Sequence, residues 1–104
     1  MREEESIRRW QNWRQWNVSD LLFREKAWED FLYWQTHDKN MLKRINTLLR
    51  DIGRGSFDGL GKPEPLKGDL SGFWSRRIDD THRLVYRIKG DTIEIVSCKG
   101  HYNI

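Results

Sequence analysis

The stretch from Phe73 to Cys98, FWSRRIDDTHRLVYRIKGDTIEIVSC, decides the fold. Large apolar and polar side chains alternate in three runs, as they do in half-buried strands: Phe73–Ile78, His82–Ile88 and Thr92–Cys98. Tight-turn signals separate the runs, at Asp79-Asp80 and at Gly90-Asp91. These features predict an antiparallel meander of three strands.

Two helices are predicted upstream of the meander. Apolar side chains recur at the helical period from about Glu25 to Thr36 and again from about Lys39 to Gly53. The short joint between them indicates a helical hairpin, and the run Leu21-Leu22-Phe23 before it is a candidate strand. The predicted fold class is α+β, with a two-helix hairpin on one face of a small antiparallel sheet. The arginine-bearing face of the middle strand should then be open, beside the long loop 53–72.

The N-terminal residues 1–18 are interpreted as an extension of the domain formed by residues 19–104. A helix is predicted over residues 2–16, because acidic residues come early and basic residues follow. Its apolar side chains recur every three residues, at Ile7, Trp10, Trp13 and Trp16. Such a face should pack on the domain, on a second subunit or on a partner protein.

Composition narrows the functional classes. A chain of 104 residues predicts one domain, and its formal charge of +3 is too small to grip bare nucleic acid by charge alone. The one cysteine, Cys98, excludes an internal disulfide, and Cys98 with His101 supplies too few ligands for a zinc site. No apolar run approaches the length of a membrane span. We expect a cytoplasmic protein without a metal or cofactor and without a membrane partner.

Five groups of residues carry a resemblance to a known family: Trp28-Glu29-Asp30-Phe31 with Tyr33-Trp34, Lys43-Arg44-Ile45-Asn46, Gly61–Lys67, Leu70–Ile78 with His82–Tyr86, and His101-Tyr102. From about Leu21 to Tyr102 the chain resembles the Txe/YoeB toxins of the RelE/ParE superfamily. The resemblance implies a RelE-like fold and a ribosome-dependent mRNA endonuclease that cuts the codon in the ribosomal A site and stalls translation. It also implies a YefM-type antitoxin and a homodimer. The chain departs from the family pattern at Gly68, where a polar residue is common, and in residues 1–18 and 103–104.

The resemblance assigns three catalytic roles, and the chemistry of the residues permits them. RNA can be cut without metal when its 2′-hydroxyl attacks the neighbouring phosphate, which requires a base, a cation for the developing charge and an acid. Glu64, between Pro63 and Pro65, is the implied general base. Arg83 is the implied clamp on the transition-state phosphate, because a guanidinium binds two phosphate oxygens at once. His101 is the implied general acid, since histidine titrates near neutral pH.

Three further residues are expected to bind substrate. Lys67 and Arg77 are candidate phosphate ligands, and Tyr102 can stack on a base of the codon. Arg76 and Arg77 must point to opposite faces of their strand, so we assign only Arg77 to the cleft.

Other readings of the same residues stay open. Glu64 can be a solvated loop carboxylate, His101 a surface residue and Arg83 half of a cross-strand salt bridge. The alternative function is a non-nuclease relative, either a ParE-like gyrase poison or a catalytically inactive protein that only binds an antitoxin.

Overall fold

The computed structural model describes residues 20–55 and 57–101. The helix predicted over residues 2–16 and the candidate stacking residue Tyr102 lie outside this part of the chain. The described elements follow one another in the order β1 (Asp20–Phe23), α2 (Glu25–His37), α3 (Lys39–Arg54), β2 (Glu64–Pro65), the 3₁₀ turn η1 (Gly68–Leu70), β3 (Trp74–Arg77), β4 (Arg83–Lys89) and β5 (Thr92–Ser97).

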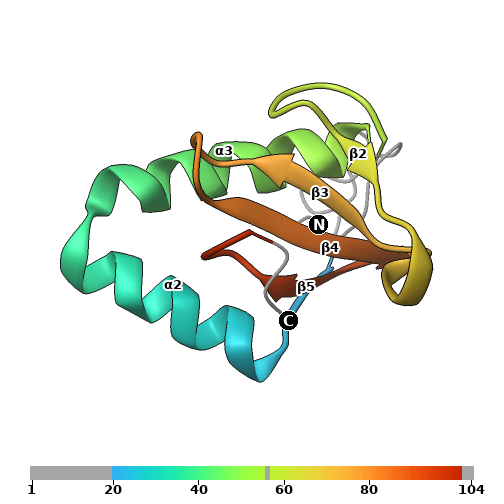
Figure 1. The fold of residues 1–104 in the computed structure, drawn as a ribbon. Coiled ribbons are helices and arrows are strands. Elements are labelled where there is room, and N and C mark those ends of the chain that lie inside the picture. Colours follow the sequence, from blue (N-terminus) through green and yellow to red (C-terminus); the bar gives the residue numbers. More distant parts are fainter. Residues whose placement is uncertain (1–19, 56, 102–104) are drawn as a thin grey trace, which may run out of the picture.

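The predicted α+β arrangement is confirmed. Helices α2 and α3 form a hairpin that packs on one face of a five-stranded sheet (Figure 1). The hydrophobic core lies between the two layers, and its most deeply buried side chains come from both helices and from β4 and β5: Ala27, Ile45, Ile52, Leu84, Tyr86, Ile93, Ile95 and Cys98. Burial raises the pKa of the Cys98 thiol to about 12, so this cysteine is an inert core residue.

The helical hairpin turns at Asp38. The Asp38 backbone is extended and ends α2, and its carboxylate accepts a hydrogen bond of 3.1 Å from the Asn40 backbone N–H at the start of α3. Helix α3 buries the predicted apolar face, although Met41 is buried where Leu42 was expected and Leu42 is only half-buried. One residue thus stops the first helix and starts the second.

The sheet has the strand order β1-β5-β4-β3-β2. The three predicted strands form the antiparallel meander as expected, and β2 adds an antiparallel pair within the loop that precedes them. The prediction of a purely antiparallel sheet is wrong at one edge, because β1 pairs parallel with β5. Parallel strands cannot be joined by a tight turn and need a long connection. Here the helical hairpin and the other strands form the connection between β1 and β5. The sheet is therefore mixed.

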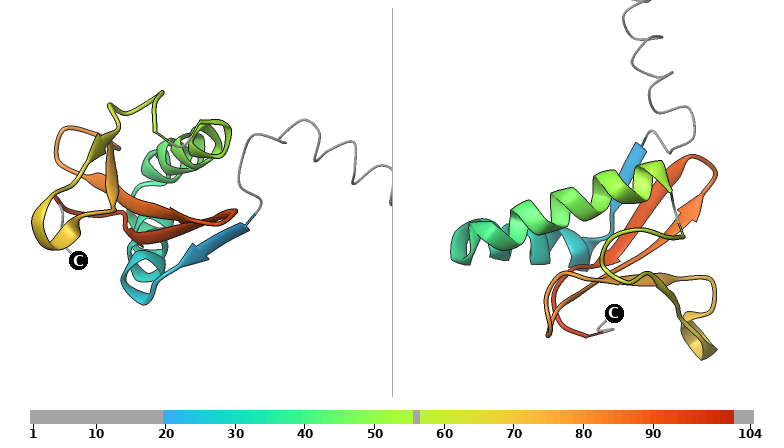
Figure 2. Two further views of the ribbon diagram at one scale, coloured as in Figure 1. Left: turned by 90° about the vertical axis from the view of Figure 1, so that its right-hand side faces the viewer. Right: turned by 90° about the horizontal axis from the view of Figure 1, so that it is seen from above.

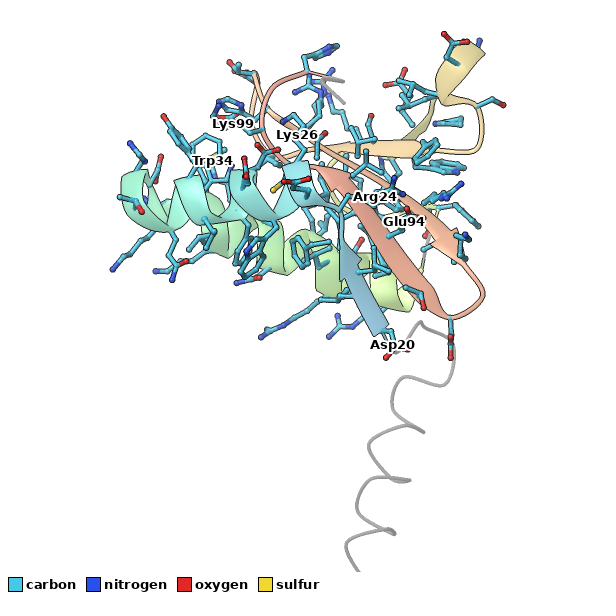
Figure 3. All side chains as sticks on the ribbon, turned by 90° about the horizontal axis from the view of Figure 1, so that it is seen from below. Asp20, Arg24, Lys26, Trp34, Glu94 and Lys99 are labelled. Carbon is cyan, nitrogen blue, oxygen red and sulfur yellow. The ribbon has the colours of Figure 1, made fainter. Side chains whose placement is uncertain are left out.

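Two salt bridges to the buried carboxylate of Glu94 join the end of β1 to β5 and β4. Glu94 on β5 forms salt bridges with both Arg24, just after β1, and Arg87 on β4 (Figure 3). The hydrogen bond from Arg87, together with Arg24, holds the pKa of the Glu94 carboxyl below its usual range despite burial. Within the described ranges, no helix has the length and apolar character needed to cross a membrane.

Candidate active site

The long loop between α3 and β3 is held by Arg76, which is fully buried. The Arg76 guanidinium donates to the Asp51 carboxylate at 2.6 Å, to the Tyr86 hydroxyl at 3.2 Å and to three backbone carbonyls, those of Gly55, Asp58 and Leu60. Burial alone would raise the pKa of Asp51, but the Leu60 N–H and the Arg76 guanidinium bring it below its ordinary value. Arg76 is therefore a structural residue, which agrees with the assignment of only Arg77 to the cleft.

Gly61 lets this loop lie against β3. Its φ of +79° favours glycine, and an added Cβ would come within 3.0 Å of the Arg77 backbone oxygen and 2.9 Å of a Leu48 methyl carbon. The Arg77 N–H donates to the Gly61 oxygen at 2.6 Å. This close approach places the following residues beside β3, where they form β2, the strand that carries Glu64.

The strand register brings four polar side chains to the sheet face away from the helices. Glu64 lies opposite Ser75 on β3, and Arg77 lies opposite Arg83 on β4. Directly opposed residues, and alternate residues along one strand, project from the same face of a sheet. Glu64, Ser75, Arg77 and Arg83 therefore share one face, which we call the outer face, and Arg76 and Leu84 point to the helices.

Glu64 and Arg83 lie on the same face of the sheet, on strands that both pair with β3. They are separated by β3 and by an offset of two residues. Strand spacings of about 4.8 Å and a rise of about 3.4 Å per residue place their Cα atoms roughly 12 Å apart. The guanidinium of Arg83 donates to the backbone of the turn at Asp79 and His82, at the end of β3 away from Glu64.

Arg83 is more enclosed than the sequence indicated. The prediction of an open arginine-bearing face is wrong at this point, because Arg83 is only 8% exposed and its neighbour on the face, Val85, is fully buried. The Arg83 Nη1 donates to the backbone oxygens of Asp79 at 2.9 Å and His82 at 3.2 Å. These contacts are to the turn before β4, and they orient one edge of the guanidinium.

His101 follows directly on a residue that pairs with the start of β4. The Arg83 backbone N–H donates to the Gly100 oxygen at 2.9 Å, so the chain after β5 runs alongside the first residue of β4. His101 is exposed. The backbone of the implied acid is thus anchored to the backbone of the implied phosphate clamp.

The two remaining described candidates are both exposed. Arg77 lies on the outer face at the end of β3, and Lys67 lies just before η1, in the turn that joins β2 to β3. In Figure 2 the η1 turn lies on the side of the sheet away from α3. Among residues 20–55 and 57–101, no three histidine, cysteine, aspartate or glutamate side chains gather where they could hold a metal ion.

The tryptophans of the described chain differ from one another. Trp34 is buried and Trp74 is half-buried, as expected for core residues. Trp28 is 47% exposed and forms an aromatic cluster with Phe23 and Phe31, with ring centroids 5.4–5.9 Å apart. Trp28 is therefore not a core residue, and its placement at an interface stays a prediction.

Sequence reasoning missed the residues that support the C-terminal segment. His82, to which no role was given, accepts a hydrogen bond from the Gly100 N–H, and Asp30 and Trp34 bond to the backbone of Cys98. The sequence held one weak indication of these contacts. Asp30 is an acidic residue on the core side of α2, where an apolar residue is expected.

Known proteins match this chain over the same region. Residues 23–102 match the family described as the YoeB-like toxin of bacterial type II toxin-antitoxin systems. Toxin YoeB of Streptomyces coelicolor is 56% identical over 82 residues, which are 79% of this chain and 98% of that protein. Toxin YoeB of Escherichia coli K12 is 54% identical over the same lengths.

Solved structures agree with the sequence relatives. A YoeB/ParE toxin from Agrobacterium tumefaciens superposes with a TM-score of 0.79 at 45% identity, covering 81% of this chain and all of that one. A YoeB dimer and a heterotetrameric YoeB-YefM complex, both from Staphylococcus aureus, each give a TM-score of 0.76 at 50% and 49% identity, covering 80% of this chain and 97% of theirs. By sequence and by fold, the chain belongs to the YoeB-like toxin family of type II toxin-antitoxin systems.

Proposed function

We propose that this toxin is a ribosome-dependent endoribonuclease that cuts mRNA in the ribosomal A site and thereby inhibits translation. The observation that carries the proposal is the shared outer face of Glu64, Arg77 and Arg83, with His101 joined to it through Gly100. A carboxylate, two guanidinium groups and an imidazole are the groups that metal-independent RNA cleavage requires.

In the proposed reaction Glu64 accepts the proton of the 2′-hydroxyl, and the freed oxygen attacks the adjacent phosphorus. Arg83 binds the phosphate oxygens as negative charge develops on them, and its enclosed position strengthens that interaction by excluding water. His101 gives its proton to the departing 5′-oxygen as the P–O bond breaks. The products are a 2′,3′-cyclic phosphate and a 5′-hydroxyl, and no cofactor takes part.

Lys67, Arg77 and Tyr102 are assigned to substrate binding. Lys67 and Arg77 are exposed cations that suit the flanking phosphates, and Tyr102 suits stacking on a base of the codon. The assignment of Tyr102 rests on the resemblance of its His-Tyr motif alone.

The ribosome supplies what the charge of the protein does not. A net charge of +3 gives weak and salt-sensitive binding to free RNA. A ribosome that presents the codon in a fixed orientation contributes up to about 7–11 kcal/mol of the barrier. The expected result is slow cleavage of naked mRNA and fast cleavage of the same mRNA in a programmed ribosome.

The partners are inferred from relatives. Solved relatives form a YoeB dimer and a YoeB-YefM complex. We infer a homodimer and a YefM-type antitoxin for this chain, and action in the cytoplasm, where translating ribosomes are found.

The decisive test compares purified wild-type protein with Glu64→Gln and His101→Gln on programmed ribosomes. Each variant should cleave about 10²–10⁴-fold more slowly, the usual contribution of a general acid or base. Glu29→Gln, an exposed carboxamide substitution on α2, is the matched control and should leave the rate unchanged. Full activity in the Glu64→Gln/His101→Gln double variant would contradict the assignment.

The same proteins separate the nuclease from a gyrase poison in cells. A nuclease stops protein synthesis before DNA synthesis and leaves mRNA 5′ ends at a fixed position within codons. Loss of DNA synthesis first, without such ends, would favour the ParE-like alternative.

A further inference from the structure

Directly after β5, the backbone of Cys98 and Lys99 is held by side chains of α2. The Cys98 N–H donates to the Asp30 carboxylate at 3.0 Å, and the Trp34 indole N–H donates to the Cys98 oxygen at 2.9 Å. Lys26 donates to Asp30 at 2.8 Å and lies 3.5 Å from the Lys99 oxygen. Figure 3 shows Lys26, Trp34 and Lys99 gathered along α2. Helix α2 therefore fixes the backbone that leads into Gly100.

The next residue, Gly100, is held by residues at the beginning of β4. The Gly100 oxygen accepts from the Arg83 N–H, and the Gly100 N–H donates to Nδ1 of His82, each at 2.9 Å. Both polar groups of Gly100 are thus satisfied by two consecutive residues. Since Nδ1 accepts the hydrogen bond from the Gly100 N–H, this ring nitrogen carries no proton in the arrangement described.

His82 is held both by its ring and by its backbone. Its ring meets the Trp34 indole edge to face, with centroids 4.8 Å apart at 77°. The His82 backbone N–H donates to the Asp79 carboxylate at 2.6 Å, and its oxygen accepts from the Ile78 N–H at 2.9 Å. Hydrogen bonds from the His82 and Thr81 N–H groups outweigh burial and hold the pKa of Asp79 below its ordinary value. The ring is therefore a fixed acceptor.

We propose that His82 is a positioning residue for His101. Its Nδ1 fixes the Gly100 amide, and the peptide between Gly100 and His101 then leaves the sheet in one direction. Because the next residue of β4 is Arg83, the same pair of residues sets the phosphate clamp and the backbone of the acid. The consequence for catalysis rests on the proposed function, but the positioning of Gly100 does not.

Two substitutions separate the hydrogen bond of His82 from its packing. In His82→Asn the amide Oδ1 lies the same number of bonds from Cα as Nδ1 does, so an acceptor remains while the ring is lost. In His82→Phe the ring against Trp34 remains while the acceptor is lost. A residue that only packs predicts that Asn is the more damaging change, whereas a positioning acceptor predicts that Phe is.

The first measurement is amide hydrogen exchange at Gly100, followed by NMR on the full chain. His82→Phe should raise the exchange rate of Gly100 by about tenfold or more, the equivalent of one lost hydrogen bond. His82→Asn should keep most of the protection. Equal protection in His82→Phe and wild type would overturn the proposal, whatever the protein does to RNA.

The second measurement is single-turnover cleavage on saturating programmed ribosomes. His82→Phe should slow cleavage about 10–100-fold, as expected when a catalytic group is misplaced by an ångström. The half-saturating ribosome concentration should not change. His82→Asn should recover most of the rate, and Glu29→Gln again serves as the control.

The two measurements distinguish the possible failures. If wild type does not cleave ribosome-bound mRNA, the proposed function fails, and the exchange result still decides whether His82 positions Gly100. If wild type cleaves and the Phe variant cleaves equally well, the catalytic part of the inference is wrong. A slower rate in both variants, in proportion to lost stability in urea, would assign His82 a packing role only.

Discussion

Arg76 and Arg77 are neighbours in the chain, but their surroundings are opposite. The Arg76 guanidinium faces the helices, is fully buried and donates to a carboxylate, a hydroxyl and three carbonyls. Arg77 faces away from the helices and is exposed. The comparison teaches that Arg76 uses its charge to hold a loop on the inner face, whereas Arg77, on the outer face, leaves its charge available to a ligand. The following predictions test that division.

The largest expected effect is on the inner face. Arg76→Met should lower the free energy of unfolding by about 3–5 kcal/mol, because it leaves the Asp51 carboxylate and three loop carbonyls without their partner. Urea unfolding followed by tryptophan fluorescence measures this. Arg77→Met is the matched control and should change stability by less than about 0.5 kcal/mol. Similar losses in the two variants would break the comparison.

On the outer face, the largest effect should come from Arg83→Lys. A lysine keeps the charge but not the two-pronged contact, so cleavage on ribosomes should fall about 10²-fold. Stability should fall by about 1 kcal/mol or less, since the contacts of Nη1 within residues 20–55 and 57–101 are hydrogen bonds to two backbone oxygens of the adjacent turn. A rate like that of wild type would mean that Arg83 supplies charge alone.

A third, smaller effect is the response of the inner face to acid. The pKa of Asp51 is lower in the folded state, so its contribution to stability is present above the unfolded-state pKa of about 3.9 and is lost as the pH falls through the lowered value. Asp51→Asn should therefore be less stable than wild type at pH 7, and the gap should narrow below about pH 4. Urea midpoints at pH 2–7 test this, and a constant gap would contradict it.

The smallest expected effect is that of Arg77→Ala on cleavage. Loss of one flanking phosphate contact should reduce the cleavage rate about tenfold. It should also raise the ribosome concentration needed for half-maximal cleavage. Lys89→Ala, at the far end of the next strand, should leave the cleavage rate unchanged. The pair of variants sharpens the comparison. It tests whether any exposed cation contributes to cleavage, or only one at this end of the outer face.

Local patterns predicted most of the fold. The two helices and the three strands of the meander lie within a residue or two of their predicted bounds, because period and turn residues are local properties. The pairing of β1 with β5 was beyond local reasoning: four residues of strand carry no information about a partner some seventy residues away.

The sequence predicted which way two neighbouring arginines point, but not the surroundings of the candidate site residues. The alternation of β3 correctly separated Arg76 from Arg77. The enclosure of Arg83 was missed, because the partners of its guanidinium are backbone oxygens, which have no signature in the sequence. The role of His82 was also missed, since its partner is a backbone N–H eighteen residues away, and a backbone group has no signature in the sequence.

The parallel pairing of β1 with β5 has a consequence for how the toxin matures during its own synthesis. β5 is the last strand in chain order, yet it lies between β1 and β4 and completes both ladders. Translation releases the chain from its beginning, so β1 waits unpaired until nearly all of the domain has been made. The sheet can therefore close only after β5 has been made. The domain gains its complete fold late in its synthesis, when its last strand joins its first.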